Sequence, residues 1–293
     1  MLPAKLKHSI EQTLGAAVLV QEPLGGGCVS PVYRLRLEDG RDVVAKLAPG
    51  NSAADQGPRS AALELEAFML QTLTEAGWPT PLVLSSSGEC LLLEFIVHDG
   101  RCGKDGEEAA GVLLAALHGR RQPSFGMTRD TVIAGLPQAN SCGDLWIPFF
   151  AEHRLIAMAR EAESAGTLDV TDRRRVERLA EGLDRWLLEP GHPSLLHGDL
   201  WGGNILFNDG QVAALIDPAC YWGHAEVELA FTTLFSTFGA AFFAAYQRTR
   251  PLEDGFFEER RDLYNLYPLL VHTRLFGGQY RASVQRLLSR YGV

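Results

Sequence analysis

Apolar and polar residues alternate with a period of two in the first third of the chain. The alternation covers residues 32–37 and 42–47 with an Asp-Gly turn between them, and it predicts a β-hairpin. Residues 61–76 instead carry leucine and alanine at helical spacing, and two further strands are expected over 82–84 and 90–96. The pattern therefore predicts a small sheet with one main helix, preceded by a short amphipathic helix at the N-terminus.

The hydrophobic period becomes helical in the second part of the chain. Apolar residues recur every three or four positions over 107–118, 147–163 and 171–188, and each stretch predicts a helix. Residues 229–247 carry no charge, but threonine, serine and glycine interrupt the run. This stretch is therefore interpreted as one buried helix and not as a membrane span.

A change of composition separates the two patterns. Residues 98–106 contain three glycines and charges of both signs, and they are the best candidate for a linker. The expected fold class is α+β with two lobes, a small β-rich lobe over residues 1–97 and a larger, mostly helical lobe over 98–293. Small-molecule sites are common between such lobes.

Composition narrows the function classes. The 293 residues carry 27 Lys and Arg against 36 Asp and Glu, a formal net charge of −9, so no nucleic-acid partner and no membrane partner is expected. Hydrophobic residues make up 46% and charged residues 22%, as in folded soluble proteins. The five cysteines are scattered without a C-x-x-C pair, which favours a reducing, cytoplasmic setting over a disulfide framework or a zinc site.

A dense run of polar residues over 197–204 carries the candidate chemistry. The hairpin that follows, over residues 205–216, brings Asn204 at its start close to Asp217 at its end, and Asp199 lies five residues before Asn204. Two carboxylates and an amide with no basic side chain near them in sequence favour a bound cation, and such oxygens suit Mg²⁺ held together with phosphates. The cluster therefore predicts phosphoryl transfer from ATP.

The spacing of the same residues leads to the same chemistry. Protein kinases carry H-R-D-x-x-x-x-N in the catalytic loop and a second metal-binding Asp on the next hairpin. This order predicts Asp199 as the catalytic base and Asn204 and Asp217 as metal ligands. Gly198 stands in place of the Arg, which predicts that the enzyme lacks the phosphorylation switch that this Arg serves in many protein kinases.

The first third supplies candidates for binding the nucleotide. A glycine-rich turn precedes the first hairpin, and glycines there let backbone N–H groups approach phosphate oxygens. Lys46 occupies the place of the kinase lysine that pairs with α- and β-phosphates, and Glu66 on the next helix is expected to orient it. The end of the last small-lobe strand is expected to contact adenine. The full set of candidates is Gly25, Gly26, Gly27, Cys28, Ser30, Lys46, Glu66, Glu94, Phe95 and Ile96.

Two motifs together resemble a known group of enzymes. The run His197-Gly198-Asp199-Leu200-Trp201-Gly202-Gly203-Asn204 and the triplet Asp217-Pro218-Ala219 resemble the kinase-like phosphotransferases that include aminoglycoside phosphotransferases and choline kinases. Within that superfamily the chain is most similar to the fructosamine/ketosamine-3-kinase family. The resemblance implies a bilobal protein-kinase-like fold and ATP-dependent phosphorylation of the C3 hydroxyl of a ketosamine sugar, on a free amine or a protein lysine. The product is unstable and releases the amine, so the implied role is repair of glycation.

The residues that would recognise the acceptor have two interpretations each. Trp201 either stacks on the sugar or its amine, or belongs to the core of the larger lobe. His224 and Glu226 either line the acceptor pocket or form a hydrogen-bonded helix start. His118 and His197 are expected to brace the structure. Cys28 is interpreted as a packing residue, with an oxidisable thiol as the alternative.

Departures from the family pattern keep other functions open. Gly202 stands where many relatives have Ser, and Ala225 where many have Arg, so the acceptor is less certain than the reaction. The alternatives are a kinase for an aminoglycoside or an amino alcohol, and a nucleotide-binding pseudokinase. The presence of Lys46, Asp199 and both metal ligands argues against the pseudokinase. A monomer is expected.

Overall fold

A computed structural model describes residues 2–25, 30–48 and 60–293 of the chain. By their internal contacts the residues form two compact units. The first, which we call the sheet unit, comprises Met1–Cys102, Ala134–Leu136 and Gly203–Pro218. The second, the helical unit, comprises Gly103–Ile133, Pro137–Gly202 and Ala219–Val293.

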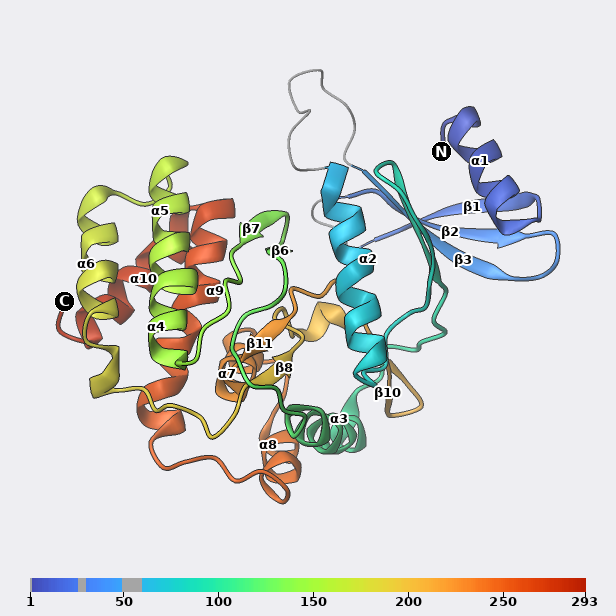
Figure 1. Cartoon of the computed structure of the whole chain (residues 1–293). Helices are drawn as coiled ribbons and strands as arrows, with labels where there is room; N and C mark the ends of the chain where they lie inside the picture. The colour runs from blue at the N-terminus through green and yellow to red at the C-terminus, as the bar shows by residue number, and fades with distance from the viewer. Residues whose placement is uncertain (1, 26–29, 49–59) are drawn as a thin grey trace. The chain divides into compact units, whose positions relative to one another are not determined.

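The sheet unit is built on a five-stranded antiparallel sheet in the order β1-β2-β3-β5-β4 (Figure 1). The strands are β1 (Val18–Leu24), β2 (Val32–Leu37), β3 (Asp42–Leu47), β4 (Val83–Ser86) and β5 (Cys90–Glu94). The predicted hairpin is confirmed as β2 and β3, which pair from Val32 opposite Lys46 to Arg36 opposite Asp42. Strand β1 was not predicted, because most of its side chains are exposed and its alternation is weak.

The two faces of this sheet are covered by different helices. On one face Leu35, Leu37 and Val43 pack with Ile10 of α1 (Ala4–Leu14). The opposite face packs against the buried side of α2 (Ser60–Glu75), where Leu63 is one of the contacts. Each buried leucine stabilises the fold by about 1.5–3 kcal/mol. Because side chains alternate along a strand, β3 contributes side chains to the packing on both faces of the sheet.

A second hairpin completes the sheet unit, as predicted. It consists of β9 (Ile205–Asn208) and β10 (Gln211–Leu215), and Asp209 and Gly210 in its turn both have positive φ, at 49° and 69°. Such turns match the twist of paired strands. The hairpin is fixed within this unit by bonds from Leu215 N–H to Pro79 C=O (2.7 Å) and from Asp99 N–H to Phe207 C=O (3.0 Å).

Those bonds bear on the domain boundary. The predicted boundary after residue 97 assigns the hairpin residues to the second lobe, whereas by contacts the segment Gly203–Pro218 belongs to the sheet unit and that unit continues to Cys102. A single boundary in the sequence cannot describe the sheet unit, because its strands β9 and β10 come from the later segment Gly203–Pro218.

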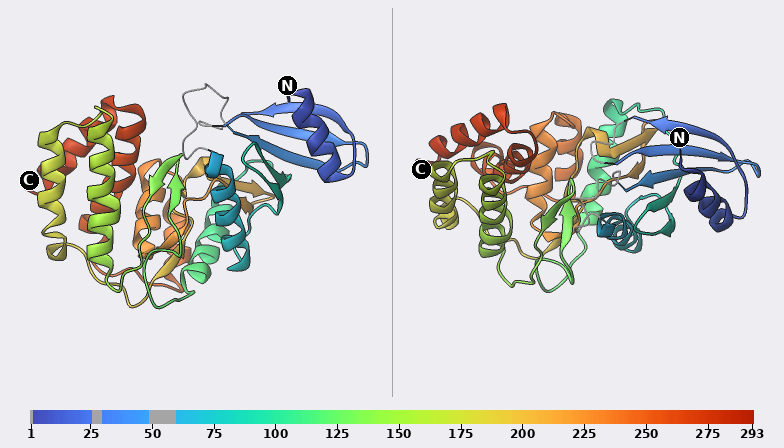
Figure 2. Two further views of the ribbon diagram at one scale, coloured as in Figure 1. Left: turned by 45° about the horizontal axis from the view of Figure 1, so that its top comes forward. Right: turned by 90° about the horizontal axis from the view of Figure 1, so that it is seen from above.

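Helices dominate the helical unit, as predicted (Figure 2). Helices α5, α6, α9 and α10 pack against one another, and α3 packs against α8. The short strands β8 and β11 pair, as do β6 and β7. The helix bounds are α3 (Gly103–His118), α4 (Trp146–Phe150), α5 (Ala157–Ser164), α6 (Val170–Ala180), α7 (Ala225–Leu234), α8 (Ala240–Gln247), α9 (Arg261–Phe276) and α10 (Gly278–Arg290). The strand bounds are β6 (Thr131–Ile133), β7 (Leu136–Gln138), β8 (Ser194–Leu196) and β11 (Tyr221–Gly223).

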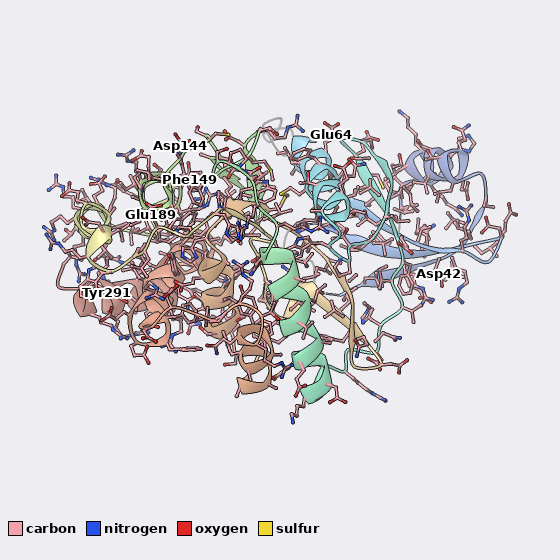
Figure 3. The ribbon with its side chains drawn as sticks, turned by 60° about the horizontal axis from the view of Figure 1, so that its bottom comes forward. Asp42, Glu64, Asp144, Phe149, Glu189 and Tyr291 are labelled. Atoms are coloured by element: carbon pink, nitrogen blue, oxygen red, sulfur yellow. The ribbon has the colours of Figure 1, made fainter. Side chains whose placement is uncertain are left out.

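The helix predicted over residues 147–163 contains a wider turn. Helix α4 continues through a π-helical segment, Ala151–Ile156, into α5. The N-terminal end of α4 is capped by Glu189, labelled in Figure 3, which accepts hydrogen bonds from the backbone N–H groups of Trp146 (2.7 Å) and Ile147 (2.9 Å). A side chain forty residues away in sequence thus replaces the local cap that the sequence lacks.

The single helix expected over residues 229–247 is wrong, because the chain forms two helices there, α7 and α8. Between them Ser236 adopts φ of +52°, a left-handed conformation that a helix does not accommodate, and Gly239 precedes α8. In the part of the chain that the structure describes, no helix has the length and apolarity to cross a membrane.

Candidate active site

The alternation of β3 places Lys46 beside an acidic pair. Lys46 lies on the strand face that packs against α2, and its Nζ lies 2.9 Å from Oε1 of Glu66 on that helix. The same Nζ lies 2.8 Å from Oδ1 of Asp217, which follows β10. The ion pair that the sequence predicted between Lys46 and Glu66 is thus present, and it is extended by a carboxylate 171 residues further along the chain.

The three charges of this group hold one another in place. Burial alone would lower the pKa of the Lys46 ammonium, but the charges of Glu66 and Asp217 outweigh it and the pKa is raised. For Glu66, burial and the charge of Asp217 raise the carboxyl pKa against the opposing effect of Lys46. Lys46 is therefore a cation at neutral pH.

Asp217 occupies an unusual backbone conformation at the end of the hairpin. Its φ of +54° lies in the left-handed region, and its side chain is 42% exposed while that of Lys46 is 12% exposed. Ile216 N–H donates to the backbone C=O of Asn204 (3.0 Å), which brings both ends of the hairpin together. Non-glycine residues adopt such conformations where surrounding structure enforces them, often at functional sites.

The oxygens of Asn204 and Asp217 are of the kind that Mg²⁺ prefers. Among the described residues, no group of three or more His, Cys, Asp or Glu side chains is placed to hold a metal ion. Two protein oxygens fill only part of the octahedral shell of Mg²⁺, an ion that usually keeps several waters and binds phosphate oxygens as well.

The helical unit carries the loop with Asp199. The loop follows β8, and its first residue, His197, is fully buried. Asp199 is partly exposed, and its N–H donates to Nδ1 of His197 at 3.4 Å. Leu200 is fully buried and anchors the loop, whereas Trp201 is 38% exposed. The interpretation of Trp201 as a core residue therefore does not describe its surroundings.

Only glycine fits the position before Asp199. Gly198 has φ of +84°, and a Cβ there would lie 2.1 Å from the backbone oxygen of Ala219. Its N–H donates to Oε1 of Glu228 at 2.8 Å. The close approach explains in physical terms why Gly replaces the Arg of protein kinases, since any side chain would displace the loop.

Glu228 links the loop to a buried network that the sequence analysis did not find. Its Oε2 accepts a hydrogen bond from Nε2 of His118 (2.9 Å), so Nδ1 of His118 is left to accept one from the Tyr246 hydroxyl (2.9 Å). Glu228 and His118 are both inaccessible to solvent, and burial raises the pKa of Tyr246. The sequence feature that could have indicated this network is Glu228 itself, which is the second acidic residue in the otherwise largely apolar helix α7.

A second set of bonds fixes the triplet after the hairpin. Ala219 N–H donates to the C=O of His197 (2.8 Å), and Ala219 C=O accepts from Nε2 of Gln138 (2.9 Å). Tyr267 in turn donates its hydroxyl to Oε1 of Gln138 (2.8 Å). Gln138 lies 81 residues before Ala219 and carries no local pattern, so sequence reasoning had no signal for it.

His224 and Glu226 form the start of α7. Nδ1 of His224 accepts a hydrogen bond from the backbone N–H of Glu226 (3.0 Å), which caps the helix. The carboxylate of Glu226 accepts two bonds from the guanidinium of Arg260, both at 2.7 Å. Burial, and after it the charge of Arg260, lowers the pKa of His224 to about 3, so the ring is neutral. These contacts give both residues internal partners and account for their burial.

The predicted adenine and phosphate segments belong to the sheet unit. Glu94 ends β5 opposite Val43, and its Oε2 accepts from the backbone N–H of Leu82 (3.2 Å). The guanidinium of Arg34 lies 4.3 Å from the centre of the Phe95 ring. Ile96, like Phe95, is partly buried. Gly25 is exposed and Ser30 partly buried, while Gly26, Gly27 and Cys28 lie outside the described residues.

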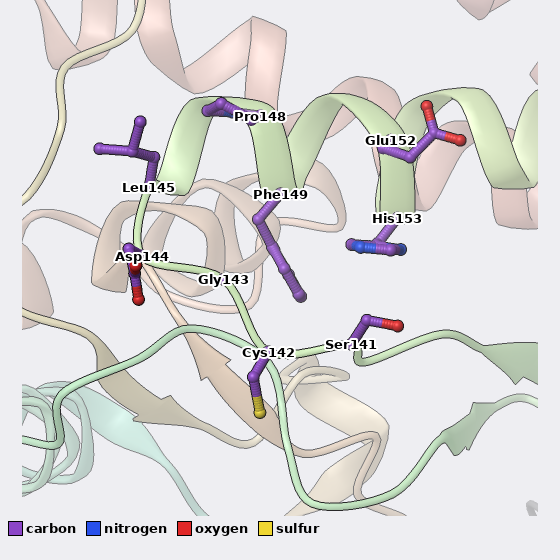
Figure 4. Close-up of a pocket in the computed structure, with 9 residues that line it drawn as sticks. All are labelled: Ser141, Cys142, Gly143, Asp144, Leu145, Pro148, Phe149, Glu152 and His153. Carbon is purple, nitrogen blue, oxygen red and sulfur yellow. The ribbon is translucent and has the colours of Figure 1, made fainter.

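The helical unit also contains a pocket of ≈ 410 Å³ beside α4 (Figure 4). The Phe149 ring and the His153 imidazole point from the helix side toward the loop that carries Ser141 and Cys142. Burial lowers the pKa of His153, and the charge of Arg154 adds to that effect. None of the predicted site residues lines this pocket.

Nearly the whole chain matches one protein family. The family model described as fructosamine kinase matches residues 1–292. A Synechocystis protein named as a probable ketoamine kinase is 36% identical over 294 residues, which cover 97% of this chain and 95% of that protein. A chloroplastic protein-ribulosamine 3-kinase of Arabidopsis thaliana is 33% identical over 276 residues, covering 92% of this chain and 81% of that protein.

Solved structures agree with these matches. A crystal structure from Thermobifida fusca, described as a fructosamine-3-kinase, has a TM-score of 0.84 and 32% identity, covering 97% of this chain and 98% of that chain. A complex of an aminoglycoside phosphotransferase with streptomycin and ATP has a TM-score of 0.63 at 14% identity, covering 99% of this chain and 97% of that chain, which shows the fold alone. The predicted kinase-like α+β fold is confirmed.

Proposed function

Because this chain belongs to the fructosamine kinase family, we propose that it transfers the γ-phosphoryl group of ATP to the C3 hydroxyl of the sugar of a ketosamine. The names of its relatives, ketoamine kinase and protein-ribulosamine 3-kinase, support this acceptor. The observation that carries the proposal is the group of Lys46, Glu66 and Asp217, which joins a largely buried, charged ammonium to an exposed carboxylate. This is the electrostatic arrangement that phosphoryl transfer requires.

Each residue of the site has a proposed role in binding ATP. Lys46 pairs with α- and β-phosphate oxygens, and Glu66 holds Lys46 in the position to do so. Asn204 and Asp217 would hold Mg²⁺, which supplies positive charge against the phosphate oxygens when it is bound. The segment from Glu94 to Ile96 is proposed to offer backbone groups to adenine, and the glycine-rich sequence that begins at Gly25 is proposed to bind the phosphates.

The chemical step needs one proton acceptor, and we assign it to Asp199. Its carboxylate takes the proton of the sugar hydroxyl as that oxygen bonds to the γ-phosphorus and the bond to the β–γ bridging oxygen breaks. ADP leaves and keeps the β–γ bridging oxygen. The loop holds Asp199 rigidly, since Gly198 and Leu200 on either side are fixed by a backbone hydrogen bond and by burial. Positioning is then the larger part of the catalysis.

The acceptor is proposed to rest on Trp201. The exposed indole lies two residues after Asp199 and offers a flat apolar face to a sugar ring. For His224 and Glu226 we favour a bracing role over contact with the acceptor, because both are buried and bonded to partners of their own. A cytoplasmic location is our proposal from the scattered cysteines, and a monomeric state is proposed as well.

The test is release of ADP with Mg²⁺-ATP and a panel of acceptors. The panel contains ribulosyl-lysine, fructosyl-lysine, an aminoglycoside and an amino alcohol, with Asp199→Ala as the inactive control. We expect turnover on a ketosamine, followed by slow release of the free amine from the phosphorylated product. Turnover on the aminoglycoside or the amino alcohol alone would refute the proposed acceptor. Equal rates for Asp199→Ala and the unchanged protein would refute the mechanism.

A further inference from the structure

A series of ring contacts in the helical unit connects Trp201 of the loop with aromatic side chains of its last two helices. Trp201 lies edge-on to Phe235 with ring centres 6.1 Å apart, and Phe235 lies 5.0 Å from His272. His272 then contacts Tyr280 at 4.9 Å and Phe276 at 5.8 Å. We call these five residues the aromatic track. They come from four separate segments, the loop, the end of α7, α9 and α10, so no local pattern in the sequence predicts them.

The track faces solvent over much of its length. Phe276 is 59% exposed, Phe235 is 38% exposed and so is Trp201, whereas His272 and Tyr280 are partly buried. Isolated exposed apolar side chains are ordinary on a protein surface, but contiguous ones mark sites of interaction. The three exposed rings, Trp201, Phe235 and Phe276, are linked through ring contacts, so they are not isolated side chains.

The backbone ties the start of the track to the catalytic loop. Gly202 N–H donates to the hydroxyl of Thr237 (3.0 Å), and Thr237 follows the left-handed Ser236 that breaks the helix after Phe235. The loop that carries Asp199 and the turn that presents Phe235 are thus held together. A molecule bound along the track would have a fixed position relative to Asp199.

The track carries no net charge. Nδ1 of His272 donates to the backbone C=O of Pro268 (2.7 Å), and burial lowers the pKa of the ring, so the imidazole is neutral at pH 7. Arg281 lies next to Tyr280 in sequence but is bound to Asp169 and Asp172. An uncharged aromatic surface suits peptide backbone and apolar side chains.

We propose that the aromatic track binds the peptide that flanks the modified lysine when the ketosamine is part of a protein. The inference rests on the proposed function and adds that a ketosamine within a polypeptide is preferred over a free one. A free ketosamine bound at Asp199 has only its sugar and one amine to place, which Trp201 serves alone. The rings from Phe235 to Phe276 lie beyond that position, and a peptide continuing from the lysine is the part of the substrate that reaches them. Stacking on several rings tolerates many sequences, as an enzyme acting on many proteins requires.

The test compares one glycated lysine in two contexts. The substrates are Nα-acetyl-ribulosyl-lysine and a peptide of about ten residues that carries the same lysine between Leu and Phe. We expect the unchanged protein to have the lower KM for the peptide. Phe276→Ala should raise the KM for the peptide roughly 3- to 10-fold, with kcat unchanged and with both constants for the small substrate within about twofold. Phe276→Tyr should retain the lower KM.

Phe257→Ala is the matched control, because Phe257 is a partly exposed ring whose neighbours are Phe243 and Phe256. It should leave the ratio of the two KM values unchanged. Equal KM values for both substrates in the unchanged protein, or an equal loss on both in Phe276→Ala, would overturn the role of the track while leaving the proposed function intact. Absence of turnover on either ketosamine would overturn both.

Discussion

The two units hold their functional groups by different means. In the sheet unit, Lys46, Glu66 and Asp217 are fixed by charge, through side chains on three separate elements. In the helical unit, the loop with Asp199 is fixed through its backbone, because Gly198 and His197 bond to Glu228 and Ala219. The three side chains of the sheet unit are thus positioned by one another's charge, whereas Asp199 is positioned by the hydrogen bonds of its neighbours.

Replacing the proposed base should produce the largest effect. Asp199→Asn keeps the shape of the side chain but removes its ability to accept a proton, so kcat should fall by roughly 10³- to 10⁴-fold. The KM for ATP and the unfolding midpoint should stay near their original values, because the loop is held through its backbone. The measurement is steady-state kinetics beside thermal unfolding. A normal kcat would show that the proton goes elsewhere.

Replacing Lys46, the cation of the Lys46, Glu66 and Asp217 group, should reduce activity and stability together. Lys46→Met should lower kcat/KM for ATP by roughly 10²- to 10³-fold. It also leaves the Glu66 carboxylate buried without its cation, which should cost about 3 kcal/mol of unfolding free energy.

The double variant Lys46→Met/Glu66→Gln separates the two effects. Removing the buried charge should restore most of the stability, measured by denaturant unfolding, but none of the activity. If stability and activity recovered together, the lysine would serve structure alone.

Removing Glu228, the hydrogen-bond acceptor of the Gly198 N–H, should have a smaller effect on the rate. Glu228→Leu leaves the Gly198 N–H without its partner and lets the loop shift, and a shift of this kind should lower kcat by roughly 10- to 100-fold. Glu228→Gln retains an oxygen for that N–H and should keep most of the activity. The readout is kcat per folded molecule, with the KM for ATP as the internal control. Equal losses in the two variants would mean that charge, and not the backbone bond, is what Glu228 contributes.

The smallest effect concerns pH and stability. The pKa of His224 is lowered to about 3 in the folded protein against 6.5 when exposed, so below pH 6.5 the unfolded chain binds a proton that the folded protein does not. Stability should therefore fall as pH falls from 6.5 toward 3. His224→Asn, which can still cap α7, should reduce that slope by up to about 1.4 kcal/mol per pH unit. Denaturant unfolding at pH 5 and pH 7 tests this, and unchanged slopes would contradict it.

The sequence predicted those features that have a local period or a fixed order. Alternation predicted the first hairpin, the Asn-Asp-Gly turn predicted the second, and the order of residues along the chain predicted the ion pair of Lys46 with Glu66. It did not predict Gln138 or Arg260, because a buried polar side chain bonded to a distant segment carries no periodic signal. The break after Phe235 was missed for a related reason: an uncharged run is typical of a buried helix, and the left-handed Ser236 is visible only in the folded backbone.

The hairpin of β9 and β10 has a consequence for the order in which the protein is made. The sheet unit comprises residues 1–102 and a segment that ends at Pro218, with the short stretch Ala134–Leu136 between them. During synthesis its first strands leave the ribosome well before the hairpin that bonds to Pro79 and Asp99. The nascent sheet must therefore wait for more than a hundred later residues before Asp217 can reach Lys46. A fragment that ends at residue 102 would lack both its last hairpin and the carboxylate that its lysine needs.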